Sequence, residues 1–537
     1  MKQRTPMKNR LNTAGAVDLN RRKFLQITTL GLAVVSTGGL LSSCSSDSGA
    51  SSSAQGATGE AKKGGTLRIG STGGSTSETL DPQSWVELPS QLRAQQLYDP
   101  LAWMAADGSP ELVMAKEVTP NADGTEWTIT IPAGITTHNG APFTAEDVLF
   151  SIQRIIDNQT PAAFLFGPID LKASSAVDDT TVKLVFSKPF GVLLDVLSFP
   201  YVYMVPRGFD PAKPDGTGPF KYQSFTPGVE STFVRNENYW QEGLPYLDTI
   251  VTQDINDESS QVSALQAGQV DVINALSAGS INALKSAGFV VKTNESGSWV
   301  PFTMNCSMEP FSDVRVRQAF RLIPDRQQML EQVFSGFGKI GNDVFSPFDP
   351  SFPTDLAQRV QDLDQAKALL KAAGYSDLKI NLTTTAAAAG EVKMAQVFAA
   401  QAKDAGVNVQ IDEYPVGTFY SDYYMKVAFG MDYGTNQLFL NNASQLMIPD
   451  YSYYNATFFD NADYTAAYNE AVSTTDDAKR KELISTMAHI DYDQGGYIVP
   501  IFSPAIEAYS TKVGGVTDSI TGVSPNNADF KSMWLAS

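Results

Sequence analysis

Cys44 is the residue with the clearest chemistry in this sequence, because the residues around it are those that direct attachment of a lipid to a cysteine thiol. It follows Leu41-Ser42-Ser43, a run typical of the box at which an exported lipoprotein is processed. Further upstream, Arg21-Arg22-Lys23-Phe24-Leu25 matches the twin-arginine export pattern. The stretch 27–41 is uncharged and only 15 residues long, whereas a membrane-spanning helix needs roughly 20. We therefore interpret residues 1–43 as a signal peptide and Cys44 as the lipidated first residue of the exported chain.

Residues 44–63 have the composition of a flexible tether. They are almost wholly Ser, Ala, Gly, Thr and Gln with a few charges, which is too polar to bury and too rich in glycine to stiffen. With a lipid on Cys44, such a tether holds a folded body near the outer face of the cytoplasmic membrane, at the cell surface or in the periplasm. The membrane is thus an expected partner, through this lipid.

The rest of the chain lacks the residues that common catalytic and metal sites require. It has two histidines, His138 and His489, so a site with several histidine ligands cannot be built. Cys306 has no second cysteine to pair with once Cys44 carries a lipid. No G-x-S-x-G elbow, phosphate loop or dinucleotide-binding glycine motif occurs. We expect a protein that is not an enzyme and that uses neither a metal nor a cofactor.

The length and the net charge of the chain further limit the classes of protein to which it can belong. Without residues 1–43 the chain has 494 residues, too many for one hydrophobic core, so two or more lobes are expected. Its formal net charge is then −25. Nucleic acid is excluded as a partner, since binding it requires a basic surface.

One segment favours binding of a ligand. Residues 414–459 contain eight Tyr and five Phe, well above the 10% aromatic content of the whole chain. Aromatic rings with polar tips provide flat apolar walls and hydroxyl hydrogen bonds for a pocket. The same rings also fill cores, and we expect most of them to do so.

The elements that must position such a site alternate between strand and helix. Period-two patterns predict strands at 66–69, 127–131 and 182–186, and helical spacing predicts a helix that Thr144 caps. Farther along, a strand at 378–382, a helix at 391–405, a turn at Gly406 and a strand at 407–411 form a β-α-β unit with parallel strands. The alternation predicts an α/β fold, with the β-α-β unit in a second lobe.

The order of several short motifs resembles the extracellular solute-binding proteins of family 5, the dipeptide, oligopeptide and nickel receptors of ABC importers. The motifs are GGTLRI at 64–69, LDP at 80–82, LYDPL at 97–101, NADGTEW at 121–127, THNGAPFTAEDV at 137–148, GTGPFKY at 216–222, RNENYW at 235–240, AGQVD at 267–271 and DVRVRQAF at 313–320. The resemblance covers about 64–504, and the block at 137–148 is its most recognisable part.

This resemblance implies a two-lobed fold like that of the class II periplasmic binding proteins, with an extra subdomain inserted in the first lobe. Lobe 1 would comprise residues 64–303, with the inserted subdomain at about 102–206, and 499–537 as its return segment. Lobe 2 would comprise 304–498. A ligand would close the lobes about a hinge, because it contacts both of them only when they are shut.

The resemblance also implies ligand contacts. In peptide-binding members an aspartate in a Trp-x-x-Asp-Tyr segment meets the ligand ammonium, and the matching positions here are Phe429, Asp432 and Tyr433. Phe429 replaces the tryptophan, and the prolines that follow in the family are absent. Leu88 and Phe164 match two further contacts. Trp299, before the expected hinge, is a candidate because an indole can both stack on a ligand and donate a hydrogen bond.

The resulting hypothesis is a monomeric, lipid-anchored receptor that delivers a small solute, above all a di- or oligopeptide, to an ABC import permease. The alternative within the same class is a non-peptide solute such as a metal chelate, a polyamine or a sugar. An exported hydrolase would need a nucleophile and a base that the sequence does not reveal, and a surface scaffold would usually show repeats.

Overall fold

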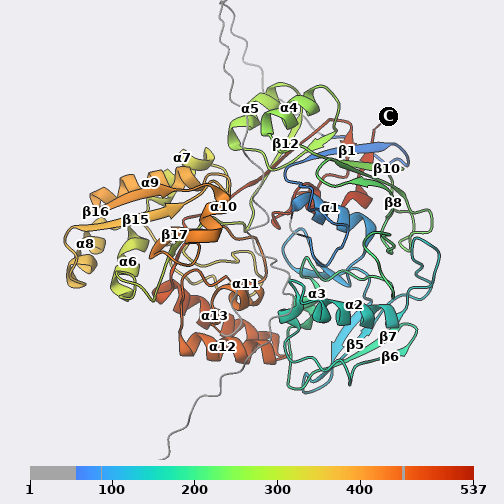
Figure 1. The fold of residues 1–537 in the computed structure, drawn as a ribbon, viewed down its shortest axis with the longest axis horizontal. Helices are drawn as coiled ribbons and strands as arrows, with labels where there is room; N and C mark the ends of the chain where they lie inside the picture. The colour runs from blue at the N-terminus through green and yellow to red at the C-terminus, as the bar shows by residue number, and fades with distance from the viewer. Residues whose placement is uncertain (1–55, 86, 450–453, 537) are drawn as a thin grey trace, which may run out of the picture.

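The computed structural model describes residues 56–85, 87–449 and 454–536. The predicted signal peptide, Cys44 and the first part of the predicted tether lie outside these residues. Within them, no helix is both long enough and apolar enough to cross a bilayer. Two large bodies lie side by side in Figure 1, each built on its own sheet.

Lobe 1 is built on a seven-stranded mixed sheet, in the order β12-β20-β11-β1-β10-β9-β8. Its central strand β1 pairs in parallel with β10 and β11. The strands of this sheet are β1 (Thr66–Ser71), β8 (Phe220–Thr226), β9 (Glu230–Arg235), β10 (Thr249–Asp254), β11 (Val272–Ile273), β12 (Val290–Asn294) and β20 (Ala505–Tyr509). The other elements are α1 (Leu88–Leu97), β2 (Ala102–Met104), β3 (Pro110–Leu112), α4 (Glu258–Gln266), η3 (Ala278–Ser280), α5 (Ile281–Ser286), β21 (Val513–Gly514), η5 (Asn526–Ala528), η6 (Phe530–Ser532) and β22 (Trp534–Leu535).

A separate four-stranded antiparallel sheet interrupts lobe 1 between β3 and β8, in the order β4-β5-β7-β6. Its elements are β4 (Glu117–Pro120), β5 (Glu126–Thr130), α2 (Ala145–Asp157), η2 (Ala163–Phe166), β6 (Ser175–Asp178), β7 (Thr181–Val185) and α3 (Leu193–Leu197). We call these elements the inserted subdomain. It lies below the lobe 1 sheet in Figure 1.

Lobe 2 is built on a five-stranded sheet, in the order β16-β15-β17-β13-β18. Its strands are β13 (Phe302–Met304), β15 (Leu378–Thr384), β16 (Val407–Glu413), β17 (Phe429–Met431) and β18 (Tyr497–Ile498). The other elements are α6 (Val314–Leu322), α7 (Arg326–Phe334), β14 (Lys339–Ile340), α8 (Leu363–Ala372), α9 (Glu391–Asp404), α10 (Val416–Thr418), η4 (Phe419–Tyr423), α11 (Phe439–Leu446), α12 (Ala462–Ser473), α13 (Asp477–Gln494) and β19 (Ile501–Phe502). The proposed division of the chain at 303/304 and 498/499 stays a prediction; β13 spans the first of these positions.

Local sequence explains why several of these elements begin and end where they do. At α2, the Thr144 N–H donates to Asp147 Oδ2 at 2.8 Å, which is half of a capping box. The predicted β-α-β unit is present, with β15 and β16 parallel along seven residue pairs. Gly406 joins α9 to β16 with a φ of 79°, a left-handed conformation that suits glycine.

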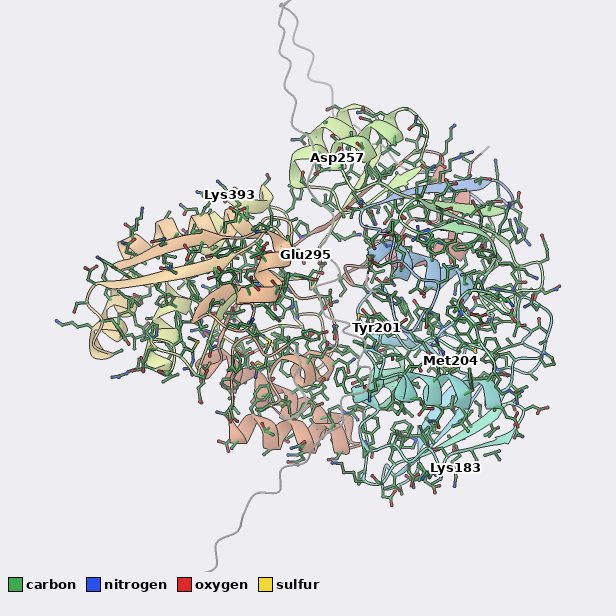
Figure 2. The ribbon with its side chains drawn as sticks, viewed as in Figure 1. Lys183, Tyr201, Met204, Asp257, Glu295 and Lys393 are labelled. Atoms are coloured by element: carbon green, nitrogen blue, oxygen red, sulfur yellow. The ribbon has the colours of Figure 1, made fainter. Side chains whose placement is uncertain are left out.

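The chain passes between the lobes twice, at 295–301 and 499–504, and the two passages are hydrogen-bonded to each other. The Ser503 N–H donates to Ser298 O at 2.8 Å, the Ser296 hydroxyl donates to Ser503 O at 2.9 Å, and Trp299 forms an antiparallel bridge with Phe502. We call this paired segment the crossing ribbon. Its exposed residue Glu295 lies between the two bodies in Figure 2.

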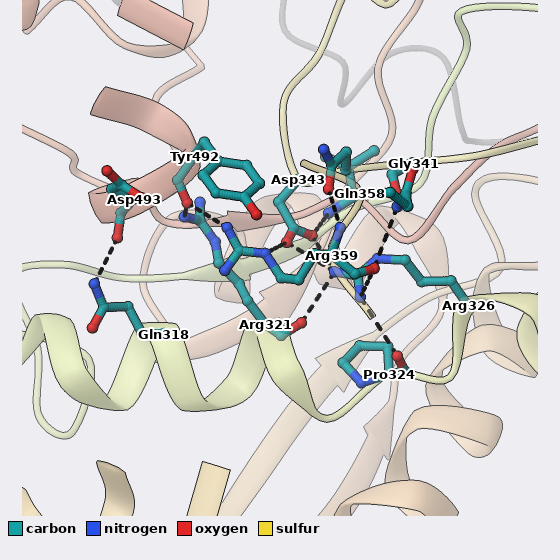
Figure 3. A network of polar contacts seen from close by, with 12 residues as sticks. Gln318, Arg321, Pro324, Arg326, Gly341, Asp343, Gln358, Arg359, Tyr492 and Asp493 are labelled. Atoms are coloured by element: carbon teal, nitrogen blue, oxygen red, sulfur yellow. Dashed lines mark hydrogen bonds and ion pairs between the residues drawn. The ribbon is translucent and has the colours of Figure 1, made fainter. Parts of the chain in front are cut away.

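A buried network of charges holds the second passage against lobe 2 (Figure 3). The Asp343 side chain is fully buried and accepts hydrogen bonds from Arg326 Nη2 at 2.8 and 2.9 Å. Arg359 Nε lies 2.9 Å from the same carboxylate. Asp343 Oδ1 also accepts the Val499 N–H at 3.1 Å. Because an unpaired buried charge is costly, these partners confine both Asp343 and the passage at Val499.

An aromatic cluster forms the centre of the lobe 2 core. Phe429 has no exposed surface, and its ring lies 5.3–5.9 Å from those of four other phenylalanines. These are Phe302, Phe311, Phe320 and Phe398. The cluster joins strands β13 and β17 to helices α6 and α9, so the packing of lobe 2 depends on Phe429.

We expect Phe429→Ala to lower the free energy of unfolding by about 3–5 kcal/mol, because it removes a fully buried ring and leaves a cavity. Urea unfolding followed by circular dichroism measures this change. Tyr222→Ala is the control, since Tyr222 is 42% exposed and its loss should cost no more than about 0.5 kcal/mol. Equal effects of the two variants would contradict a packing role for Phe429.

Candidate functional site

The carboxyl ends of β15 and β17 form a topological switch point in the lobe 2 sheet. These strands are parallel neighbours, with Thr383 opposite Gly430. From β15 the chain continues to β16 on one side, whereas from β17 it continues through α11–α13 to β18 on the other. In open α/β sheets, ligands bind in the crevice outside such a point. Figure 1 places β17 and α10 on the side of lobe 2 that is next to lobe 1.

Asp432 is the first residue after β17 and lies at this switch point. It is 3% exposed. Its Oδ2 accepts the Tyr424 hydroxyl at 2.9 Å, and its Oδ1 accepts the Tyr433 N–H at 2.8 Å. The Asp432 N–H donates to Pro301 O at 3.2 Å, so the residue is attached to the crossing ribbon. These bonds give the carboxyl group a defined orientation beside the junction of the lobes.

A second carboxyl group, that of Glu391, lies at the same edge of the sheet. Glu391 is the first residue of α9, which follows β15, and is 1% exposed. It accepts the Ala388 N–H at 3.1 Å, and its other oxygen lies 3.5 Å from the Thr384 hydroxyl. Burial raises the pKa of the Glu391 carboxyl to about 8, and repulsion from Asp432 adds to the rise. At neutral pH Glu391 is therefore mainly protonated.

The raised pKa of Glu391 predicts a pH-dependent stability. The unfolded chain ionises this group near pH 4.5, whereas the folded protein keeps the proton until about pH 8. The contribution of Glu391 to stability therefore falls as pH rises between these values, and it is constant above the folded pKa. We expect Glu391→Gln to melt a few degrees higher than the natural protein at pH 8.

At pH 4.5 the two proteins should melt within about a degree of each other, because the folded protein is then protonated at this position and the unfolded chain is only about half ionised. Differential scanning calorimetry of both proteins across this range measures the difference. Glu413→Gln, an exposed change, is the control and should follow the natural protein at every pH. If the melting temperatures of Glu391→Gln and the natural protein differed by the same amount at every pH, the raised pKa of Glu391 would be refuted.

Trp299 lies in the crossing ribbon and is 2% exposed. Its ring stacks on Phe345 at 6.0 Å and meets the edge of Tyr497 at 5.2 Å. Its backbone exchanges two hydrogen bonds with Gly434, at 2.8 and 3.0 Å. A side chain at 434 would overlap the indole, which explains the glycine. The indole is therefore enclosed by neighbours in this conformation, and its proposed contact with a ligand stays a prediction.

The structure brings some of the predicted site residues together and separates others. Asp432, Tyr433 and Trp299 lie along one stretch where the chain after β17 runs beside the crossing ribbon. Tyr433 is half-buried there. Phe429 lies in the lobe 2 core, where packing accounts for it. Leu88 opens α1 and packs on the lobe 1 core, and Phe164 lies in η2 of the inserted subdomain. Their ligand contacts stay predictions.

Lobe 1 also carries carboxyl groups at the carboxyl end of its central strands. Asp254, the last residue of β10, and Glu78 both pair with Arg93, which is fully buried. Glu87 directly precedes Leu88 and accepts the Ser75 hydroxyl at 2.7 Å. Burial raises the pKa of the Glu87 carboxyl and raises that of Asp254 to about 7. Two carboxyl groups thus pair with one guanidinium, which leaves that guanidinium less able to attract a further anion.

Two contributors to the site were missed by reasoning from the sequence, namely Glu391 and Tyr424. The helix at 391 was predicted, and a glutamate directly after a strand-to-helix loop is a signal that could have suggested Glu391. Tyr424 was one of the aromatic residues in 414–459, where composition alone did not separate it from those in the core.

Comparison with known proteins identifies the family of this chain. Residues 109–465 match the bacterial extracellular solute-binding proteins, family 5. The glutathione-binding protein GsiB of Salmonella typhimurium is 25% identical over 497 residues, which cover 85% of this chain and 93% of that protein. Heme-binding protein A of Haemophilus influenzae is 26% identical over 479 residues, covering 80% and 86%. The structure of DppA from Helicobacter pylori in complex with the peptide STSA matches with a TM-score of 0.75 and 20% identity, covering 89% and 99%.

The chain belongs to the bacterial extracellular solute-binding proteins, family 5. It is a solute-binding receptor of an ABC importer, and the predicted α/β two-lobed fold is confirmed. These are non-catalytic transport binding proteins, so the prediction that the chain is not an enzyme is also confirmed. A small solute and the ABC transporter are the partners that this family implies.

Proposed function

We propose that this receptor is anchored by a lipid on Cys44 and captures a di- or oligopeptide between its lobes for delivery to the import permease. The observation that carries the peptide assignment is Asp432, a buried carboxyl group at the switch point of lobe 2 and next to the crossing ribbon. A peptide ammonium is its natural partner, because a charge-assisted hydrogen bond is strong where water is excluded.

The surroundings of Asp432 favour a cation over an anion. Glu391, on the same edge, gives up its proton only near pH 8, so Asp432 is the carboxyl group of this edge with which an arriving ammonium would pair. In lobe 1 the Arg93 guanidinium is already paired with Glu78 and Asp254, so it does not offer a partner to an anionic solute. The relatives named as binding glutathione and the peptide STSA support a peptide-like solute.

In this proposal, closure of the lobes signals to the permease that a ligand is bound. A ligand that touches both lobes binds the shut form more tightly than the open one, and it shifts the population by that difference in affinity. The crossing ribbon lets the lobes rotate without losing their register, since its two passages are bonded to each other. The permease would recognise the shut form.

The peptide assignment is tested by native mass spectrometry of the gently purified protein. We expect a ladder of peptide masses that Asp432→Asn releases, because the amide carries no charge to pair with an ammonium. Loss of a hydrogen bond to a charged group should weaken binding about tenfold or more. Asp404→Asn, an exposed change at the end of α9, is the control and should retain the same masses.

One non-peptide mass that persists in Asp432→Asn would refute both the peptide and the ammonium contact. It would favour the alternative of a non-peptide solute such as a metal chelate, a polyamine or a sugar. Heme-binding protein A, a relative of similar identity, makes that alternative a concrete one.

The lipid anchor is tested separately by fractionating cells that express the full chain. The natural protein should remain with the membranes, and Cys44→Ala should move to the soluble exported fraction, because the thiol that accepts the lipid is gone. Cys306→Ala is the matched control and should stay with the membranes. Retention of Cys44→Ala on membranes at the natural level would contradict lipidation at this residue.

A further inference from the structure

The inserted subdomain touches lobe 2 at a place far along the chain from both passages of the crossing ribbon. The Gly191 N–H donates to Val472 O at 2.7 Å, and Gly191 O accepts Arg480 Nη2 at 2.7 Å. Asn441 Nδ2 donates to Asp195 O at 3.3 Å. We call these five residues the clasp. Figure 1 shows α3 of the inserted subdomain next to α11–α13 at this point.

The clasp requires a glycine at position 191. A Cβ there would overlap the carbonyl oxygen and carbon of Thr474, which belong to the backbone and cannot swing away. The φ of Gly191 is not in the left-handed region, so the requirement comes from the closeness of lobe 2 and not from the local backbone of the subdomain. The glycine is explained only by the docked arrangement.

Each side of the clasp is held rigidly by its own lobe. On the subdomain side, Phe190 O accepts the Trp127 Nε1–H at 2.7 Å, and the Phe190 ring stacks on Phe186 at 4.7 Å. On the lobe 2 side, Arg480 Nη2 also donates to Thr474 O at 2.8 Å, and Nη1 contacts Asp477 at 2.7 Å. Both surfaces are therefore preorganised, and docking them orders few further groups.

No covalent connection holds the two surfaces together here. The chain passes between the lobes at 295–301 and 499–504, whereas the clasp joins 191–195 to 441–480. A rotation of the lobes about the crossing ribbon would therefore have to break the clasp. The same rotation would also separate the apolar side chains that pack between the inserted subdomain and α11–α13, and it would leave the hydrogen bonds within each lobe intact.

We propose that the clasp is a second closing contact of the receptor, formed only when the lobes are shut, and that Arg480 and Gly191 set how far the ligand-free protein favours the shut form. A contact that exists in one of two states shifts their equilibrium by its own free energy. The clasp therefore raises ligand affinity without touching the ligand, because it increases the fraction of molecules in the binding-competent, shut form.

The proposal is tested by hydrogen exchange of the ligand-free protein with mass spectrometry, resolved to the Gly191 amide. In the natural protein this amide should exchange faster than the amides of β5 and α2, because opening the lobes exposes it without unfolding the subdomain. Arg480→Gln should speed its exchange at least about tenfold, since it removes the charge-assisted hydrogen bond from Arg480 to Gly191 O. Lys481→Gln, an exposed change on the same helix, is the control and should leave it unchanged.

Small-angle X-ray scattering provides an independent readout. Arg480→Gln and Gly191→Ala should both increase the radius of gyration of the ligand-free protein, and Lys481→Gln should not. If Gly191→Ala folds poorly, Arg480→Gln alone carries the test.

The proposal is overturned if the Gly191 amide exchanges together with those of β5 in the natural protein, or if Arg480→Gln lowers only the melting temperature. Either result would mean that the subdomain stays fixed to lobe 2 at all times. Because no ligand is added, these outcomes do not depend on whether the solute is a peptide.

Discussion

The structure depends on the pairing of the two passages between its lobes. Since the chain leaves lobe 1 once and returns once, two strands of backbone must cross the junction, and each would expose polar groups if it crossed alone. Here they bond to each other through Ser296, Ser298 and Ser503. Asp343, with the guanidinium groups around it, then holds the second passage at Val499. The ribbon is thereby stiffened along its length, and in the described part of the chain it is where the backbone passes between the lobes. Apolar side chains of the inserted subdomain and of α11–α13 also pack into one buried cluster across the junction.

The candidate site is next to this ribbon for a physical reason. The chain after β17 runs beside the first passage, bonded to it at Pro301 and Trp299, so the carboxyl end of the lobe 2 sheet cannot move away from the junction. A carboxyl group placed there is partly desolvated by lobe 2 alone and would be further desolvated on closure. The high pKa of Glu391 reflects this low local polarity.

Periodicity and capping predicted the local elements well, because they depend on interactions between residues close in sequence. The helix that begins after Thr144 and the β-α-β unit around α9 are examples. The roles of single side chains were harder to predict. Phe429 and Asp432 are three residues apart, yet one lies inside the lobe 2 core and the other at its edge. Which residue of the segment turns inward depends on the pairing of β17 with β13 and β15, which no local pattern reveals.

The export pattern, the α/β alternation and the resemblance to a family could be read from the sequence alone, because each is carried by short segments in a given order. The position of Glu391 and Asp432 at one edge, the enclosure of Trp299 and the contact of Gly191 with Arg480 follow from the tertiary structure. The reason is separation along the chain. Residues 191 and 480 are 289 positions apart, and their contact results from how two complete lobes pack, a property that no segment carries alone.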